Sequence, residues 1–120
     1  MWAVYGGSFN NMTLLEMYEK VNLTLPLEQR RFFNYFNDSS EELLSLYGNF
    51  ALEKDVPYKA PESLSDNIAV RALYHTAIVD NILFLAGQGD AYKSEFLRKA
   101  HNAYLKYWNE NARGRKLKTK

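Results

Sequence analysis

The 120-residue sequence predicts an all-α fold, a small domain of about four helices that ends in a long antiparallel helical hairpin. Apolar residues recur at helical spacing through most of the chain, and capping residues or glycines stand where the periodic stretches begin and end. Strand-like alternation is brief and falls between the second and third helices, where a short extended or hairpin segment is expected. The pattern divides the chain into an N-terminal arm (1–12), a helical domain (13–112) and a basic tail (113–120).

The first two helices have clear end signals. Thr13-Leu-Leu-Glu16 has the form of a capping box, and the helix that it opens should stop before Pro26. The second helix is expected over about 27–47, with Gly48 at its C-terminal end. Asn37-Asp-Ser-Ser40 could cap a new helix, but the apolar stripe keeps its phase across it, so one continuous helix is predicted.

The last two helices should form the hairpin. Ser63-Leu-Ser-Asp66 carries capping chemistry and predicts a third helix from there to Ala86, whose broad apolar face indicates a central position. Gly87-Gln-Gly-Asp90 then supplies a left-handed glycine and an N-cap within one short turn, which predicts antiparallel neighbours. The fourth helix carries several aromatic residues and fades into the basic tail.

Composition and motifs argue against catalysis. The chain has no cysteine, no apolar run near the roughly 18 residues that span a membrane, and no signal-peptide pattern, so cytoplasmic synthesis is expected. Val4-Tyr-Gly-Gly-Ser-Phe-Asn-Asn11 is similar to the phosphate-binding opening of nucleotidylyltransferases, but no histidine follows until His75 and no parallel sheet is predicted. His75 and His101 lack metal-ligand spacing, and no carboxylate is paired with a nucleophile. We therefore expect no enzyme activity, no cofactor and no metal.

Charge and aromatic content bear on what the chain could bind. Residues 1–112 hold ten Lys and Arg against all fourteen Asp and Glu, whereas the last eight residues hold five basic side chains and no acid. The tail could bind nucleic-acid phosphates, bind an acidic protein surface, or serve only as a solubilising terminus. Eighteen aromatic residues are many for a small helical fold to bury, which favours oligomerisation. The expected inter-subunit residues are Trp2, Tyr5, Phe9, Phe32 and Tyr35.

The order of elements resembles the head–tail connector (adaptor or neck) proteins of tailed bacteriophages. Three segments over roughly residues 13–112 carry the resemblance. They are Val21-Asn-Leu-Thr-Leu-Pro26 with the Arg/Phe-rich helix that follows, Tyr58-Lys-Ala-Pro-Glu-Ser-Leu64, and the hairpin from Ala69-Val-Arg-Ala-Leu-Tyr74 through Gly87-Gln-Gly-Asp90 to Ala103-Tyr-Leu-Lys106. The arm before Thr13 and the pair Ser39-Ser40, where alanine is more usual, depart from the family pattern.

The resemblance implies a structural virion protein at the head–tail interface. Such adaptors form a ring, usually a dodecamer, beneath the portal protein; they extend the channel that passes genomic DNA and receive a stopper or tail-completion protein. The loop over 49–61 would face the channel or that tail-side partner. The expected portal-binding residues are Trp108, Arg113, Arg115, Lys116, Lys118 and Lys120. The alternative is a small helical nucleic-acid-binding or regulatory protein that uses the basic tail on phosphates.

Overall fold

The computed structural model describes residues 12–53 and 57–119, and side chains as far as Asn109. Its helices are α2 (Leu14–Thr24), α3 (Gln29–Tyr47), α4 (His75–Leu85) and α5 (Asp90–Thr119), with 3₁₀ turns η1 (Gly48–Ala51) and η3 (Ala72–Tyr74). Within the described ranges no strand forms, and the one pairing of extended backbone is an antiparallel bridge between Leu52 and Val70. The fold class predicted from the sequence, all-α, is confirmed.

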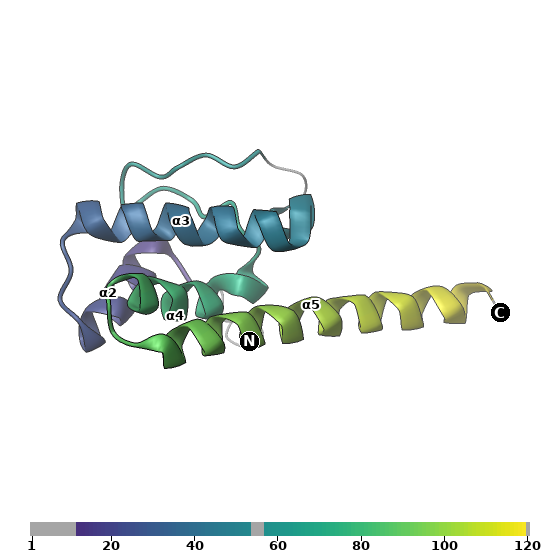
Figure 1. The fold of residues 1–120 in the computed structure, drawn as a ribbon. Helices are drawn as coiled ribbons and strands as arrows, with labels where there is room; N and C mark the ends of the chain where they lie inside the picture. The colour runs from purple at the N-terminus through teal and green to yellow at the C-terminus, as the bar shows by residue number, and fades with distance from the viewer. Residues whose placement is uncertain (1–11, 54–56, 120) are drawn as a thin grey trace, which may run out of the picture.

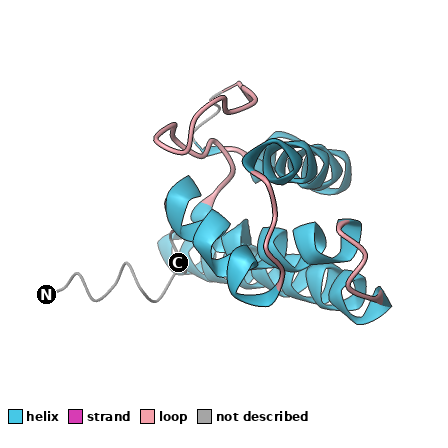
Figure 2. Cartoon of the chain, turned by 90° about the vertical axis from the view of Figure 1, so that its left-hand side faces the viewer, coloured by secondary structure: helices cyan, strands magenta, loops and turns pink. Residues whose placement is uncertain are grey.

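Helix α4 lies at the centre of the domain. It packs against α2, α3 and α5, and most of its residues are buried, from His75 to Leu83. Figure 1 shows α3 running along one side of α4 and α5, while the connection between η1 and η3 passes over the opposite side of α3. Figure 2 shows the same separation of α3 from the other helices in a view turned by 90°. The core therefore lies between α3 and the layer that contains α4.

The first two helices form where their local signals predict. The Thr13 hydroxyl accepts from the backbone N–H of Glu16, and the Glu16 carboxylate accepts from the backbone N–H of Thr13, so the capping box is complete. Helix α3 begins two residues later than expected and ends at Gly48, whose φ is 64°. It is continuous through Ser40, whose hydroxyl donates to the Phe36 carbonyl at 2.9 Å.

The third helix begins much later than the sequence predicts. The predicted capping residues from Ser63 to Asp66 form a turn instead of a helix start. The Asp66 carboxylate closes this turn by accepting from the backbone N–H groups of Glu62 and Ser63 at 2.8 and 3.1 Å. Two backbone hydrogen bonds flank the bridge, from the N–H of Glu53 to the Ala69 carbonyl and from that of Arg71 to the Ala51 carbonyl, each 2.8 Å long. These bonds hold 69–71 extended, so α4 starts only at His75.

The segment between α3 and α4 differs from a hairpin. A 3₁₀ turn, η1, begins at Gly48, and Leu52 then pairs with Val70 of the distant segment before α4. The two extended segments that pair are thus joined by a long connection, whereas the strands of a hairpin are joined by a short turn.

The turn between α4 and α5 uses its first glycine as expected. Gly87 has φ 91°, its N–H donates to the Phe84 carbonyl at 2.9 Å, and the N–H of Gln88 donates to the Leu83 carbonyl at 3.0 Å. Asp90 is the first residue of α5, one position later than the N-cap role predicted for it. Because α4 has 11 residues and α5 has 30, α5 continues well beyond its contact with α4 and includes most of the predicted basic tail.

Candidate interaction site

Six aromatic rings gather where α5 leaves the body of the domain. They come from the end of α3 and the adjoining η1, from η3 and from α5, so three segments far apart in sequence meet there. We call this group the aromatic cluster; its members are Tyr47, Phe50, Tyr74, Tyr104, Tyr107 and Trp108.

Phe50 is the hub of the aromatic cluster. Its ring centroid lies 4.7 Å from that of Tyr107 with the planes at 68°, and 6.0 Å from that of Trp108 with the planes at 29°. Tyr47 stacks on Tyr104 with centroids 4.8 Å apart. These are the edge-to-face and offset arrangements that aromatic pairs prefer, and each adds on the order of 1 kcal/mol beyond the burial of area.

Arg71 places a positive charge against the aromatic cluster. Its guanidinium carbon lies 4.7 Å from the centroid of the Phe50 ring and 5.4 Å from that of Tyr107. Its Nε donates to the Phe50 carbonyl at 2.6 Å, which ties the segment before η3 to η1. Burial, together with the neighbouring tyrosine hydroxyls, raises the pKa of Tyr47 and Tyr74, so both phenols stay neutral at physiological pH.

Burial falls across the aromatic cluster from the core to the surface. Tyr74 is fully buried, whereas the Trp108 side chain is 39% exposed. Trp108 is therefore held on one side by Phe50 and open to solvent on the other. A partly exposed tryptophan that packs on other rings is typical of the anchor residues in protein–protein interfaces.

A polar network joins α3, α4 and α5. Asn81 on α4 donates to the Ser39 hydroxyl at 2.9 Å and accepts from the Lys93 ammonium at 3.2 Å, and Lys93 forms an ion pair with Glu42. A second ion pair links Asp80 to Lys99 at 2.7 Å. Two lysines of α5 thus pair with carboxylates of α3 and α4, and these ion pairs fix the position of α5 on the domain.

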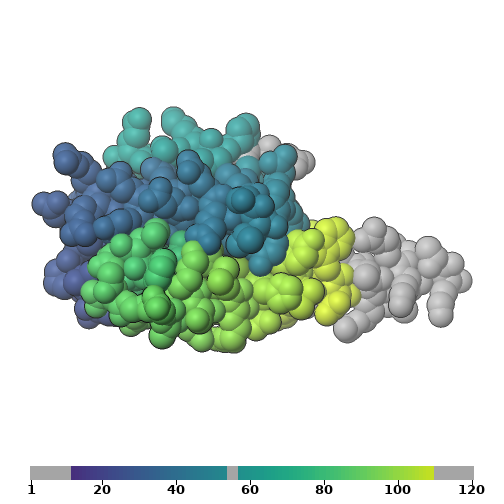
Figure 3. Space-filling model, in the orientation of Figure 1, coloured from purple at the N-terminus to yellow at the C-terminus, as the bar shows by residue number. Residues whose placement is uncertain are grey.

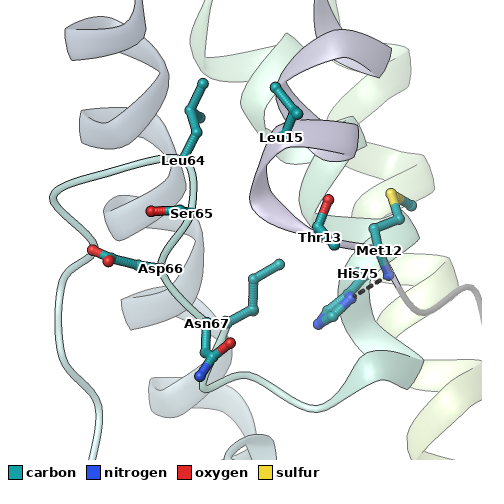
Figure 4. A pocket seen from close by; sticks show the side chains of 9 residues that line it. Met12, Thr13, Leu15, Leu64, Ser65, Asp66, Asn67 and His75 are labelled. Atoms are coloured by element: carbon teal, nitrogen blue, oxygen red, sulfur yellow. Dashed lines mark hydrogen bonds between the residues drawn. The ribbon is translucent and has the colours of Figure 1, made fainter.

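His75 is committed to structure. It is buried at the edge of a hollow of about 550 Å³ beside the start of α2 (Figure 4), its Nδ1 accepts from the backbone N–H of Met12 at 3.2 Å, and its Nε2 lies 2.9 Å from the Val70 carbonyl. Since Nδ1 accepts, Nε2 carries the proton and donates to Val70. Burial lowers the pKa of His75, and the bond to Val70 and the charge of Glu53 only partly oppose this. Both ring nitrogens are occupied, so His75 offers no catalytic or metal-binding atom.

The structure places the predicted partner-binding residues as follows. Trp108 belongs to the aromatic cluster. Arg113, Arg115, Lys116 and Lys118 lie on α5, where the structure describes the backbone alone, and Lys120 lies outside the described residues.

The predicted inter-subunit residues divide into three cases. Trp2, Tyr5 and Phe9 lie outside the described residues. Tyr35 is half-buried, and its hydroxyl accepts from the Arg31 guanidinium at 2.8 Å. Phe32 is 0% exposed, packed against Tyr18 with ring centroids 5.1 Å apart. The inter-subunit role predicted for Phe32 is therefore wrong, because its ring is fully buried in the core of its own chain.

Phe50, the hub of the aromatic cluster, and Arg71 beside it are among the residues that the sequence did not identify as site residues. They lie 21 positions apart, on either side of the connection between η1 and η3. The usable signal was an aromatic residue shortly after the C-terminal glycine of a helix. That signal indicates a chain returning to its core, but not which partner it meets.

The described residues were also compared with the requirements of a metal site and of a membrane-spanning helix. No group of three or more His, Asp or Glu residues there is arranged to hold a metal ion. None of the described helices is both long and apolar enough to cross a membrane.

No protein-family model, curated protein or solved structure matches this chain.

Proposed function

We propose that the chain is a head–tail connector, or adaptor, of a tailed bacteriophage. It is a structural virion protein that assembles as a ring beneath the portal, extends the DNA channel and joins the capsid to the tail. In this proposal α4 and α5 are the antiparallel helical hairpin of such adaptors, and the segment over 49–61 is the extended connection, facing the channel or the tail-side partner. Assembly takes place in the bacterial cytoplasm.

One observation supports the proposal above the others. Helix α5 starts against α4, passes the aromatic cluster and continues beyond the body (Figure 1), and its last turns carry Arg113, Arg115, Lys116 and Lys118 without an acidic residue among them. A helix that aromatic and ionic contacts fix to the domain, and whose backbone extends past those contacts, is suited to reach a second protein. The contacts proposed for the portal are Trp108, Arg113, Arg115, Lys116, Lys118 and Lys120.

Charge distribution supports the same function. The excess of acidic residues over 1–112 disfavours a grip on DNA phosphates, as suits a channel through which DNA must slide. In this proposal the exposed face of Trp108 and the basic end of α5 contact the protein partner.

The test is co-sedimentation with portal rings of the same phage. The full chain should bind the rings, and a chain ending at residue 112 should not, while its circular dichroism and unfolding midpoint stay close to those of the full chain. A matched control keeps the helix and removes the charge: the tail-Gln variant replaces Arg113, Arg115, Lys116, Lys118 and Lys120 by glutamine.

The outcomes separate two parts of the proposal. Loss of binding in both variants assigns the contact to charge, and loss in the truncated chain alone assigns it to the helix. Unchanged binding by the truncated chain would overturn the portal contact. Failure of the full chain to bind the rings, read by native mass spectrometry of the mixture, would overturn the adaptor function.

A further inference from the structure

Helix α2 presents leucines to solvent on the side opposite its buried face. Leu14, Met17 and Val21 are fully buried, whereas Leu15 and Leu23 are 47% and 87% exposed. Glu19, also exposed, stands midway between these two leucines. Because residues four apart share a helix face, Leu15, Glu19 and Leu23 form one outward stripe, which we call the α2 triad.

Helix α5 carries a stripe of the same form. Leu97 and Leu105 are 42% and 44% exposed, and the exposed His101 stands midway between them. We call Leu97, His101 and Leu105 the α5 triad. The exposed edge of Trp108 follows three residues further along the same helix.

The two triads are complementary in spacing and in chemistry. Each places two leucines eight residues apart, about 12 Å at 1.5 Å per residue, with one polar side chain halfway. The central side chain of the α2 triad is a carboxylate, and that of the α5 triad is an imidazole, whose ring N–H donates to a carboxylate in either tautomer. Leucine would meet leucine and Glu19 would meet His101 whichever way the two helices run.

The triads lie on two different helices of one molecule. Both α2 and α5 pack against α4, and Figure 3 shows α2 at one end of the body and α5 along its lower edge. Two different complementary patches on one chain make a heterologous contact, which repeats from copy to copy and closes into a ring when the rotation allows it. A self-complementary patch would instead give an isolated dimer.

We propose that the α2 triad of one copy of this chain docks on the α5 triad of the next. The occupant of each exposed stripe is thus a second copy, because the chain itself carries the matching spacing and the matching polar group. This inference rests on the ring assembly in the proposed function and names the surfaces that build it.

Cysteine cross-linking tests the contact directly, since the chain has no cysteine of its own. Glu19→Cys and His101→Cys are made as separate proteins, and the central positions are chosen because they meet in either helix direction. Under mild oxidation, an equal mixture should give a mixed disulfide dimer, and each variant alone should stay largely uncross-linked. The matched control is Leu46→Cys on α3, which is 49% exposed and belongs to neither triad, and which should cross-link with neither partner.

Three outcomes would overturn the inference: no mixed dimer, an equal yield with Leu46→Cys, or efficient dimers of a single variant. Charge exchange gives a second measurement in the presence of portal rings. Glu19→Lys and His101→Glu should each reduce the number of copies bound per ring, and the double variant should restore it. If both single variants bound each portal ring with the full number of copies, the triad contact would be refuted and the portal contact would stand. No binding by the unmodified chain would refute the adaptor function instead, while the cross-link could still form.

Discussion

At the scale of single residues, His75 links folding to pH. Its neutral ring accepts from Met12 before α2 and donates to Val70 before η3, so one side chain ties together two segments 58 positions apart in sequence. Protonation would place a second N–H against the Met12 N–H and remove that acceptor. The ring therefore binds its proton less readily in the folded chain than in the unfolded one.

This difference predicts a loss of stability in acid. Because the folded pKa of His75 lies below the ordinary value of 6.5, the unfolded chain binds the extra proton first, and the free energy of unfolding falls as pH drops through that value. His75→Gln, whose amide can accept and donate in the same place, should show a smaller decrease between pH 7 and pH 5 in urea unfolding. His101→Gln changes an exposed histidine and should keep the full decrease. Parallel curves for all three proteins would contradict the assignment.

At the scale of elements, the prediction from sequence succeeded where a helix end depends on neighbours in the chain. The capping box at Thr13 and the glycines Gly48 and Gly87 act through residues within a few positions of themselves. It failed at Ser63, because the same capping chemistry also closes a turn, and the bridge between Leu52 and Val70 decides between the two. The contact between Phe50 and Trp108 also joins residues far apart in the chain, so the sequence identified Trp108 as a site residue but not its partner Phe50.

The contacts between helices predict different effects of replacing Asn81 and its partner Ser39. Asn81 is fully buried and bonds to Ser39, Glu42 and Lys93, whereas Ser39 has Asn81 as its partner across the helices. Asn81→Ala should lower the free energy of unfolding by about 1–3 kcal/mol, since it strands polar groups of α3 and α5. Ser39→Ala should cost less than about 1 kcal/mol, because the Asn81 amide keeps its contact with Glu42. Urea unfolding of both variants measures the difference, and equal losses would contradict this division of roles.

At the scale of the whole molecule, charge separates the body from the end of α5. The interaction with DNA distinguishes an adaptor from a protein that uses its basic end on phosphates. Neutralising phosphates releases counterions, so the logarithm of the binding constant falls with the logarithm of salt concentration, with a slope of about −0.9 for each phosphate contacted. With five basic residues in the tail, tail-driven binding would have a slope no steeper than about −4 to −5.

For the adaptor we expect no measurable binding of a 30-base-pair duplex at 150 mM salt, because the acidic body repels the phosphates that the tail attracts. Weak binding at 20 mM salt should vanish in the tail-Gln variant, whose net charge is lower by five. Fluorescence anisotropy over that salt range measures both quantities. Micromolar binding that persists at 150 mM salt and disappears in the tail-Gln variant would instead identify the end of α5 as a nucleic-acid contact. The same variant's effect on portal binding then decides whether the charges serve a protein or a phosphate backbone.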